Sequence, residues 1–380
     1  MKKKAEQLLV ILFVGTLFLL SMLFFLLPHQ RFSELENRYL QRPPKLTLEN
    51  VLSSKYAEEA ENYVTDHFPF RNKWLWAKSV SEQARLQQEN NGIYKGEAEY
   101  LFEKFLQPNY EKLQEYIEAL NVFSGNHPDV DMTLMLAPTS VGLYPERLPW
   151  LAPSYSQEKV NNYIGDQLKK EVTYLDGFNF LRPHVSESIY YRTDHHWTTY
   201  GAYLAYVAYA EKKGWQPLSQ REFLIREVSN SFLGSYHTRS QFQGLSPDTI
   251  EAYLPHEQVA TELFIADTNE KLTNMYDESF LQKKDQYSYF QGGVHALMTI
   301  KSDLDAQHIE QEKLLIIKDS YAHNVIPFLT NHVSEIHVID IRYYNGSIAE
   351  YMSENELKNV LYLFNTATFV DEASLLKLNN

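Results

Sequence analysis

The residues best suited to chemistry are four consecutive ones, Asp194, His195, His196 and Trp197, which lie just ahead of a helical pattern. A histidine can accept the proton of a nucleophilic serine, and a carboxylate can hold that histidine in the required tautomer. The short spacing between Asp194 and His196 allows one turn to supply both groups. Burying an aspartate and two histidines without a role would cost free energy, which disfavours a purely structural segment.

A candidate nucleophile, Ser320, ends the sequence LLIIKDS, whose apolar part has the pattern of a buried strand. The residues from Ala322 onward have a helical pattern, so we expect Ser320 at a sharp turn from a strand into a helix. Unpaired N–H groups at the start of a helix can stabilise a developing oxyanion. The more common role of a serine at this place is to cap the helix.

Two alternatives to this pairing are weaker. A metal site would need Asp194, one of the adjacent histidines and further ligands. His237, His295 and His323 are candidates, but no motif with fixed ligand spacing, such as HExxH, connects them. Ser140 is a rival nucleophile because it also follows a predicted strand, but it lacks the context of a helix start. We therefore expect a serine site without a metal.

Four short apolar runs have the pattern of strands buried on both faces, which is typical of a parallel sheet. Helical patterns lie between them, and this alternation predicts an α/β core with a mainly parallel sheet. Functional groups in such sheets collect in the loops after the carboxyl ends of the strands. The predicted strands are residues 132–138, 314–317, 335–340 and 359–366, and the predicted helices are residues 109–125, 198–213, 321–332 and 349–358.

The remaining segments are expected to be a helical entry segment, a hairpin and an insertion. Residues 31–90 have mostly helical patterns, and residues 93–102 contain two apolar runs around a glycine-containing turn, which indicates a hairpin. Residues 215–300 read as a long insertion whose fold the pattern does not predict. Because no repeat or low-complexity linker divides residues 29–380, we expect one domain there rather than two.

The N-terminus predicts a membrane anchor over residues 1–28. Three lysines precede a run of roughly 20 apolar residues, which is the length an α-helix needs to cross a bilayer. A cleaved signal peptide would have a shorter apolar core and a cleavage site with small residues, and neither is present. The lysines favour a cytoplasmic N-terminus, so the rest of the chain is expected outside the membrane, at a bacterial cell surface.

The composition excludes several functional classes. The 380 residues include 35 Lys and Arg against 49 Asp and Glu, and the resulting net charge of -14 opposes binding to nucleic acid. The chain has no cysteine, which excludes disulfides, thiolate metal sites and a cysteine nucleophile. Its 44% hydrophobic residues are sufficient for a large folded core.

The sequence resembles the DHHW proteins, membrane-anchored relatives of the alginate O-acetylation proteins AlgJ and AlgX. The resemblance implies a three-layer SGNH-hydrolase-like fold with a mainly parallel sheet, preceded by one transmembrane helix. It covers nearly the whole chain. The segments that carry it are the N-terminal anchor, Asp194-His195-His196-Trp197, Lys318-Asp319-Ser320-Tyr321, Glu36-Asn37-Arg38, Asp66-His67-Phe68-Pro69-Phe70-Arg71, Ala137-Pro138-Thr139-Ser140 and Asp340-Ile341-Arg342-Tyr343-Tyr344.

This resemblance implies a catalytic triad in which Ser320 is the nucleophile, His196 the base and Asp194 the acid that orients it. Two differences from the wider superfamily are present. Lys318 occupies the position of the glycine in a Gly-Asp-Ser motif, and the usual Asp-x-x-His is absent because Trp197 is the third residue after Asp194. His195 remains an alternative base.

Five residues are candidates for substrate binding. Gly292 and Gly293 could bring a loop backbone close to the substrate, or they could only shape a turn. Arg342 follows a predicted strand and could bind substrate or pair with a carboxylate. His195 and Trp197 adjoin the predicted base and acid.

The expected function is that of an extracytoplasmic O-acetyltransferase which acts on a polysaccharide through an acyl-serine intermediate. By the resemblance, a multi-spanning MBOAT-type membrane protein would deliver the acyl group, and no cofactor is expected. One alternative is a carbohydrate esterase with the same triad, and another is a non-catalytic polysaccharide-binding protein.

Overall fold

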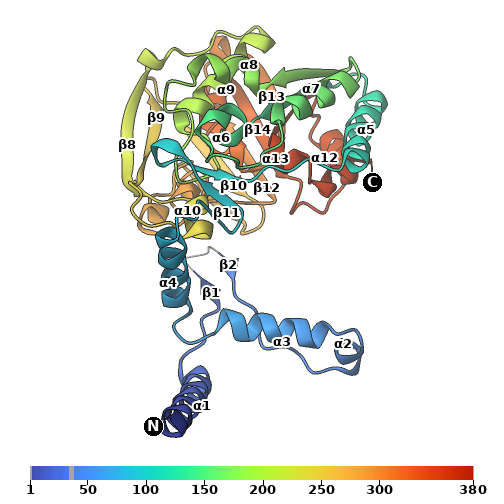
Figure 1. Cartoon of the computed structure of the whole chain (residues 1–380). Helices are drawn as coiled ribbons and strands as arrows, with labels where there is room; N and C mark the ends of the chain where they lie inside the picture. The colour runs from blue at the N-terminus through green and yellow to red at the C-terminus, as the bar shows by residue number, and fades with distance from the viewer. Residues whose placement is uncertain (1, 34–37, 380) are drawn as a thin grey trace. The chain divides into compact units, whose positions relative to one another are not determined.

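The computed structural model describes residues 2–33 and 38–379. Glu36 and Asn37, which belong to one of the segments noted above, lie outside the described residues. The chain forms two compact units. We call residues 1–87 with 241–243 the N-terminal unit, and residues 88–240 with 244–380 the C-terminal unit (Figure 1).

The N-terminal unit is mostly helical, as the sequence pattern predicts. Its first helix is long and apolar enough to cross a membrane, a property shared by membrane anchors and signal sequences. A two-residue strand pair and three further helices follow it. The elements are α1 (Lys2–Leu26), β1 (Phe32–Ser33), β2 (Arg38–Tyr39), α2 (Leu48–Leu52), α3 (Lys55–Asp66) and α4 (Arg71–Ala84).

An eight-stranded sheet forms the centre of the C-terminal unit, with the strand order β11-β10-β12-β14-β13-β15-β6-β7. The five strands from β14 to β7 are parallel, which confirms the predicted mainly parallel sheet. The strands are β6 (Asp131–Ala137), β7 (Val172–Asp176), β10 (Thr261–Ile265), β11 (Glu270–Leu272), β12 (Leu297–Ser302), β13 (Gln311–Lys318), β14 (Val333–Asp340) and β15 (Asn359–Asn365).

Helices cover both faces of this sheet and make the fold three-layered. The connection from β13 to β14 moves across the sheet in one direction, whereas the connections from β14 to β15 and from β6 to β7 move in the other. Because such crossovers are right-handed, α11 (Ile326–Leu329) lies on the face opposite α7 (Gln157–Gln167) and α12 (Ile348–Glu354). Helices α8 (Gly177–Leu181) and α9 (Thr199–Lys213) pack together, and α9 also contacts α11. On the other face, α5 (Tyr110–Asn126) hydrogen-bonds α7 (Figure 1).

The insertion contributes strands to the edge of the main sheet and a separate strand pair. Strands β10 and β12 extend the sheet in antiparallel orientation next to β14. Strands β8 (Phe223–Phe232) and β9 (Asp248–Pro255) pair with each other, and α10 (Ser235–Ser240) lies between them in the sequence. The predicted hairpin is confirmed, since β4 (Ile93–Lys95) pairs with β5 (Leu101–Glu103). The remaining short strand and α-helices are β3 (Glu89–Asn90), α6 (Ser140–Leu143) and α13 (Thr366–Phe369), and single turns of 3-10 helix occur in several loops.

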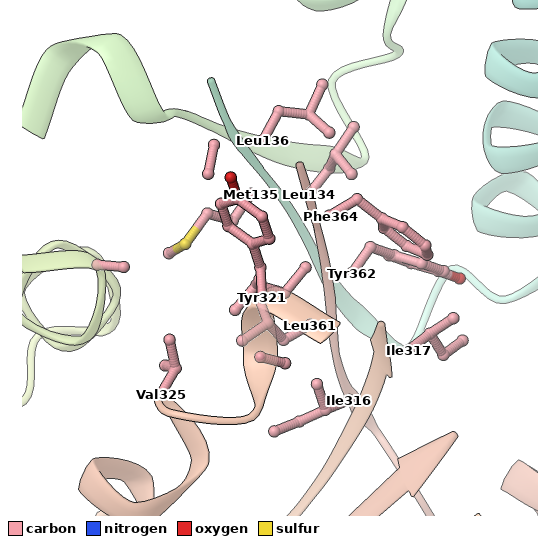
Figure 2. Packing of buried hydrophobic residues seen from close by; sticks show 14 of the residues in the cluster. Leu134, Met135, Leu136, Ile316, Ile317, Tyr321, Val325, Leu361, Tyr362 and Phe364 are labelled. Carbon is pink, nitrogen blue, oxygen red and sulfur yellow. The ribbon is translucent and has the colours of Figure 1, made fainter. Parts of the chain in front are cut away.

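Apolar side chains on both faces of β13, β15 and β6 explain why these runs form central strands. Ile317, Tyr362 and Phe364 lie on one side of the strands, and Met135 and Tyr321 lie on the other (Figure 2). All five are essentially inaccessible to solvent. Burial of this kind contributes roughly 1.5–3 kcal/mol for each large side chain, so the strands are fixed firmly beneath the loops that follow them.

The helix predicted from residue 321 to 332 is wrong at both ends, since α11 covers only Ile326–Leu329. One turn of 3-10 helix, Ser320–Ala322, follows β13, and α11 begins only at Ile326. Pro327 explains the break. Proline is tolerated only in the first turn of a helix, because further along its ring would clash with the carbonyl four residues earlier. Asp319, and not Ser320, is the residue that caps the turn, since its carboxylate accepts a hydrogen bond from the Tyr321 N–H at 2.8 Å.

We predict that His332 makes the stability of the protein depend on pH. The ring is buried against Trp215, its Nε2 lies 2.6 Å from the Tyr206 hydroxyl, and burial lowers its pKa to about 4 from 6.5. In the unfolded chain His332 regains its ordinary pKa, so the unfolded state binds the extra proton between these values. The free energy of unfolding should therefore fall by up to about 3 kcal/mol as the pH drops from 6.5 to 4.

The variant His332→Gln tests this dependence because it keeps a hydrogen-bonding side chain that does not titrate. Urea unfolding of both proteins should show a shallower pH dependence for the variant across this window. Parallel curves for the two proteins would contradict the prediction.

Candidate active site

The structure brings Asp194, His196 and Ser320 into one hydrogen-bonded line. The Asp194 Oδ1 lies 2.5 Å from the His196 Nδ1, and the His196 Nε2 lies 2.7 Å from the Ser320 Oγ. An ionised carboxylate can only accept hydrogen bonds, so the His196 Nδ1 donates and its Nε2 is free to accept from the hydroxyl. This is the tautomer that can remove a proton from serine.

Hydrogen-bond donors stabilise the charge on the buried Asp194 carboxylate. It accepts hydrogen bonds from the backbone N–H groups of His196 at 3.0 Å and Ser235 at 2.6 Å. Burial alone would raise the pKa of Asp194, but the nearby His195 and His196 and these hydrogen bonds lower it well below its ordinary value. Asp194 therefore stays ionised beside the imidazole at any physiological pH.

Gly234 leaves the space that this carboxylate occupies. A Cβ at this position would lie 2.2 Å from the Asp194 Cβ and 2.4 Å from its Oδ2, a separation that real contacts do not reach. The role of Gly234 and Ser235 is not predictable from the sequence pattern, because both come from the insertion and neither belongs to a recognisable motif.

His196, and not His195, is the histidine that contacts Ser320. The His195 Nδ1 is 2.6 Å from the Ser235 hydroxyl, and about a third of its side chain is exposed. Surrounding protein atoms and the adjacent His196 lower the pKa of His195 to about 4. His195 is therefore neutral at physiological pH and lies beside the hydrogen-bonded line rather than in it.

The expectation that Trp197 contacts substrate is corrected by its burial. Its side chain is 0% exposed, and its indole N–H donates to the Tyr321 carbonyl at 3.0 Å and the Asn324 Oδ1 at 2.8 Å. The Tyr321 hydroxyl in turn donates to the His195 carbonyl. Trp197 and Tyr321 thus fasten the base-bearing segment to the serine-bearing turn, although the two segments are far apart in the sequence.

The turn that carries Ser320 is held by Asp319 and Asn365. The Asp319 Oδ2 accepts hydrogen bonds from the Asn365 N–H at 2.8 Å and the Asn365 Nδ2 at 2.7 Å. Asn365 ends β15, the strand next to β13, so it ties the nucleophile turn to the neighbouring strand. A polar residue at the end of a buried strand was the only sequence signal for this role.

Lys318, which occupies the place of the glycine in a Gly-Asp-Ser motif, is the last residue of β13, and its side chain is fully buried. Its Nζ lies 3.2 Å from the Asp340 Oδ2 and 2.7 Å from the His323 Nε2. Arg342 binds the same Asp340 carboxylate at 2.8 Å and 2.6 Å. Of the two roles expected for Arg342, the structure therefore shows pairing with a carboxylate.

Tyr287, another residue of the insertion, packs directly on the predicted base. Its ring stacks on the His196 imidazole with centroids 3.6 Å apart and planes inclined by 11°. Its hydroxyl donates to the Ser320 carbonyl at 3.2 Å. Tyr287 therefore restricts rotation of the imidazole and contacts both residues of the His196–Ser320 pair. The tyrosine-rich composition gives no indication of which tyrosine does this.

Gly292 and Gly293 lie in a turn with φ values of 72° and 100°. Both values are in the left-handed region that favours glycine, and the Gly293 N–H donates to the Phe290 carbonyl at 3.3 Å. Of the two roles expected for these glycines, the backbone geometry therefore supports the shaping of a turn.

The alternative nucleophile and the alternative metal site are both less well supported by the geometry. Ser140 is fully buried, and within the described residues its hydroxyl has no hydrogen-bond partner and hence no base. In the described part of the chain, Asp194, His195 and His196 form the one group with metal-ligand spacing. The 2.5 Å between Asp194 and His196 suits a hydrogen bond, whereas two ligands about 2.1 Å from one tetrahedral metal would lie roughly 3.4 Å apart.

A groove of about 440 Å³ lies next to the candidate site, at the carboxyl ends of β6 and β15. Its walls include His195, Tyr236, Thr139 and Asn365. The centroids of the His195 and His196 rings are 3.7 Å apart, and Asn365 hydrogen-bonds Asp319. The groove therefore adjoins the Ser320 turn.

Comparisons with known proteins agree with the expected family and fold. Residues 122–339, more than half of the chain, match the family model described as DHHW protein. The comparison with curated proteins finds no match.

Two solved structures show the shared fold, and a third is more distant. A DHHW family protein from Eubacterium siraeum is 24% identical with a TM-score of 0.67, over 77% of this chain and 96% of that one. Bacillus cereus PatB1, solved with a sulfonyl adduct, is 16% identical with a TM-score of 0.62, over 73% and 97%. The O-acetyltransferase domain of Pseudomonas putida AlgJ is 14% identical with a TM-score of 0.45, over 76% and 99%.

We predict that Gly234→Ala inactivates the Ser320 hydroxyl, because the added methyl group must displace the Asp194 carboxylate. The rate at which a sulfonyl fluoride labels Ser320, followed by intact mass, should fall by at least about 100-fold. Gly125→Ala is the matched control, since a Cβ there meets nothing within 4 Å. Equal labelling rates for the two variants would refute the role assigned to Gly234.

Proposed function

The chain belongs to the DHHW protein family, and we propose that it is a serine-dependent O-acetyltransferase that modifies a cell-surface or secreted polysaccharide. One observation carries this proposal: the Asp194 carboxylate, the His196 imidazole and the Ser320 hydroxyl are hydrogen-bonded in series at 2.5 Å and 2.7 Å. A non-catalytic binding protein would not require an ionised buried acid, an oriented base and a partly exposed serine in this order.

In the first step, Ser320 attacks the carbonyl carbon of an acetyl donor. The bond from the Ser320 Oγ to the acetyl carbon forms as His196 takes the hydroxyl proton on its Nε2. We assign the oxyanion to the backbone N–H of Ser320, because the Tyr321 N–H already donates to Asp319. Asp194 stabilises the imidazolium. The tetrahedral intermediate then collapses, and His196 returns the proton to the departing donor group.

In the second step, a sugar hydroxyl attacks the acetyl-serine. His196 removes the proton of that hydroxyl, the new sugar ester forms, and Ser320 recovers its proton from His196 as it leaves. Because Tyr287 stacks on the imidazole, His196 presents its Nε2 to Ser320 and to the incoming hydroxyl from the same orientation in both steps.

The groove beside the Ser320 turn supports a polysaccharide as the acceptor. Amide and hydroxyl side chains can both donate to and accept from sugar hydroxyls, and several of them line this groove. Its charged lining residues include two carboxylates, Glu103 and Asp371, and one ammonium, Lys104, a balance that suits a neutral chain better than a polyanion. Besides His195 and Tyr236, the polar lining residues are Glu103, Lys104, Gln107, Asn109, Thr139, Gln157, Asn365, Thr368 and Asp371.

The acetyl donor has to reach this site on the outer side of the membrane. We propose that α1 anchors the chain with its N-terminus in the cytoplasm and the C-terminal unit outside, as its length and the preceding lysines favour. By the family resemblance, a multi-spanning MBOAT-type partner would supply the acetyl group from the cytoplasm.

We predict that Ser320→Ala abolishes O-acetyl esters on the polysaccharide of cells in which this chain is the acetylating enzyme. Ester content is measured by release of acetate in mild alkali, with protein level followed in parallel. Ser140→Ala is the matched control because Ser140 also follows a strand, but within the described residues its hydroxyl has no partner that could act as a base. It should leave the ester content unchanged. Full ester content in the Ser320 variant would reject the proposal.

We predict that Asp194→Asn lowers the turnover number by about 10³–10⁴-fold, because an amide places the imidazole proton on the wrong nitrogen. The measurement is transfer of acetyl from a small activated ester to an oligosaccharide by the purified protein, with hydrolysis of the same ester recorded alongside. Hydrolysis without any transfer in the wild type would identify an esterase that uses the same residues. A variant with wild-type rates of both reactions would show that Asp194 has no catalytic role.

A further inference from the structure

We propose that the turn between α3 and α4 is a second membrane-contacting element, which inserts into the lipid headgroup region at the outer end of α1. We call residues Phe68–Trp74 the aromatic turn. This inference rests on the proposed membrane anchoring of α1 and concerns the N-terminal unit alone. No step of the proposed reaction uses these residues.

Direct contacts place the C-terminal end of α3 against the end of α1. The His29 ring, just after α1, stacks on the His67 ring with centroids 4.6 Å apart. The His29 Nδ1 lies 2.5 Å from the Tyr63 hydroxyl, and its Nε2 lies 2.8 Å from the Phe24 carbonyl in the last turns of α1. The start of the aromatic turn is therefore at the level where α1 leaves the hydrocarbon.

A cavity of about 280 Å³ extends this contact to residues 68–73 of the turn. Its walls are formed by residues 27–30 on one side and by residues 66–73 on the other, with Ser33 and Leu40. The aromatic turn and the end of α1 thus form one continuous surface. A protein element at this level of a bilayer meets phosphate headgroups and the first carbons of the lipid chains.

The exposed side chains of the turn match that environment. Phe70 and Trp74 are 50% and 55% exposed, and Phe68 is exposed as well. Arg71 and Lys73 lie between them in the sequence, and the Lys73 ammonium lies 5.5 Å from the centre of the Phe70 ring. Aromatic rings next to basic groups are favoured at the lipid headgroups, where the rings enter the apolar boundary and the cations meet phosphate.

The backbone of the turn supports a role beyond connecting two helices. Phe70 has a φ of 60°, in the left-handed region, where a bulky residue is rare and strained. Such strain costs roughly 1–3 kcal/mol and tends to persist at functional positions. Here the strained residue is one of the exposed aromatic rings, so the strain is kept at a residue that would contact lipid.

Site-directed spin labelling tests the inference on the full chain, which is convenient because the chain has no cysteine. Phe70→Cys and Trp74→Cys each receive a nitroxide label, and the proteins are reconstituted into vesicles of equal amounts of phosphatidylglycerol and phosphatidylcholine. The accessibility of each label to oxygen and to a water-soluble nickel chelate reports its depth in the membrane. Both labels should show a severalfold higher ratio of oxygen to nickel accessibility than an aqueous label.

Two controls in the N-terminal unit make the outcomes distinguishable. Val14→Cys, in the middle of α1, reports the bilayer interior. Ser81→Cys, exposed on the same helix as Trp74, lies roughly 16 Å beyond Phe70 and should remain in water. If Val14 is in lipid while Phe70 and Trp74 match Ser81, the anchor stands and the inference is overturned, and the aromatic turn is then a surface for a protein partner. If Val14 is not in lipid, both the anchor and the inference fail.

Discussion

The buried carboxylate of Asp194 is the constraint on which the arrangement of the site depends. A charge removed from water must be surrounded by hydrogen-bond donors, and here they are the His196 ring, the His196 N–H and the Ser235 N–H. Gly234 is required because any side chain would enter the same space. The Asp194 carboxylate thus fixes the orientation and tautomer of His196 and the position of the Gly234-Ser235 backbone beside it. The same insertion supplies the Tyr287 ring that stacks on His196.

The sequence predicts the α/β architecture from local patterns, whereas the pairing of Asp194, His196 and Ser320 is what the family resemblance implies. Continuous apolar runs are sufficient to identify β6, β13, β14 and β15, since strands of a parallel sheet are buried on both faces. The choice between His195 and His196 stays open in the sequence, apart from the family resemblance. Adjacent residues differ only in the direction of their side chains, which depends on the tertiary contacts of Tyr321 and Trp197.

The features that sequence reasoning missed arise from long-range packing. Gly234, Ser235 and Tyr287 come from a segment without periodicity, and their roles exist only once that segment has folded against residue 194. Trp197 adjoins the candidate acid and base, but its indole N–H finds partners inside the core. The short turn after Ser320 is a local effect of Pro327 that the apolar pattern of residues 321–332 conceals.

The dependence of the Ser320 turn on Asn365 has a consequence for biosynthesis. Asp319 gains two of its hydrogen bonds from Asn365, which follows it by 46 residues in the sequence. During synthesis, a ribosome-bound chain already contains the acid, the base and the serine while the strand that steadies the serine is still missing. A message that ends before β15 would therefore encode a product with all three reactive groups but an unsupported nucleophile.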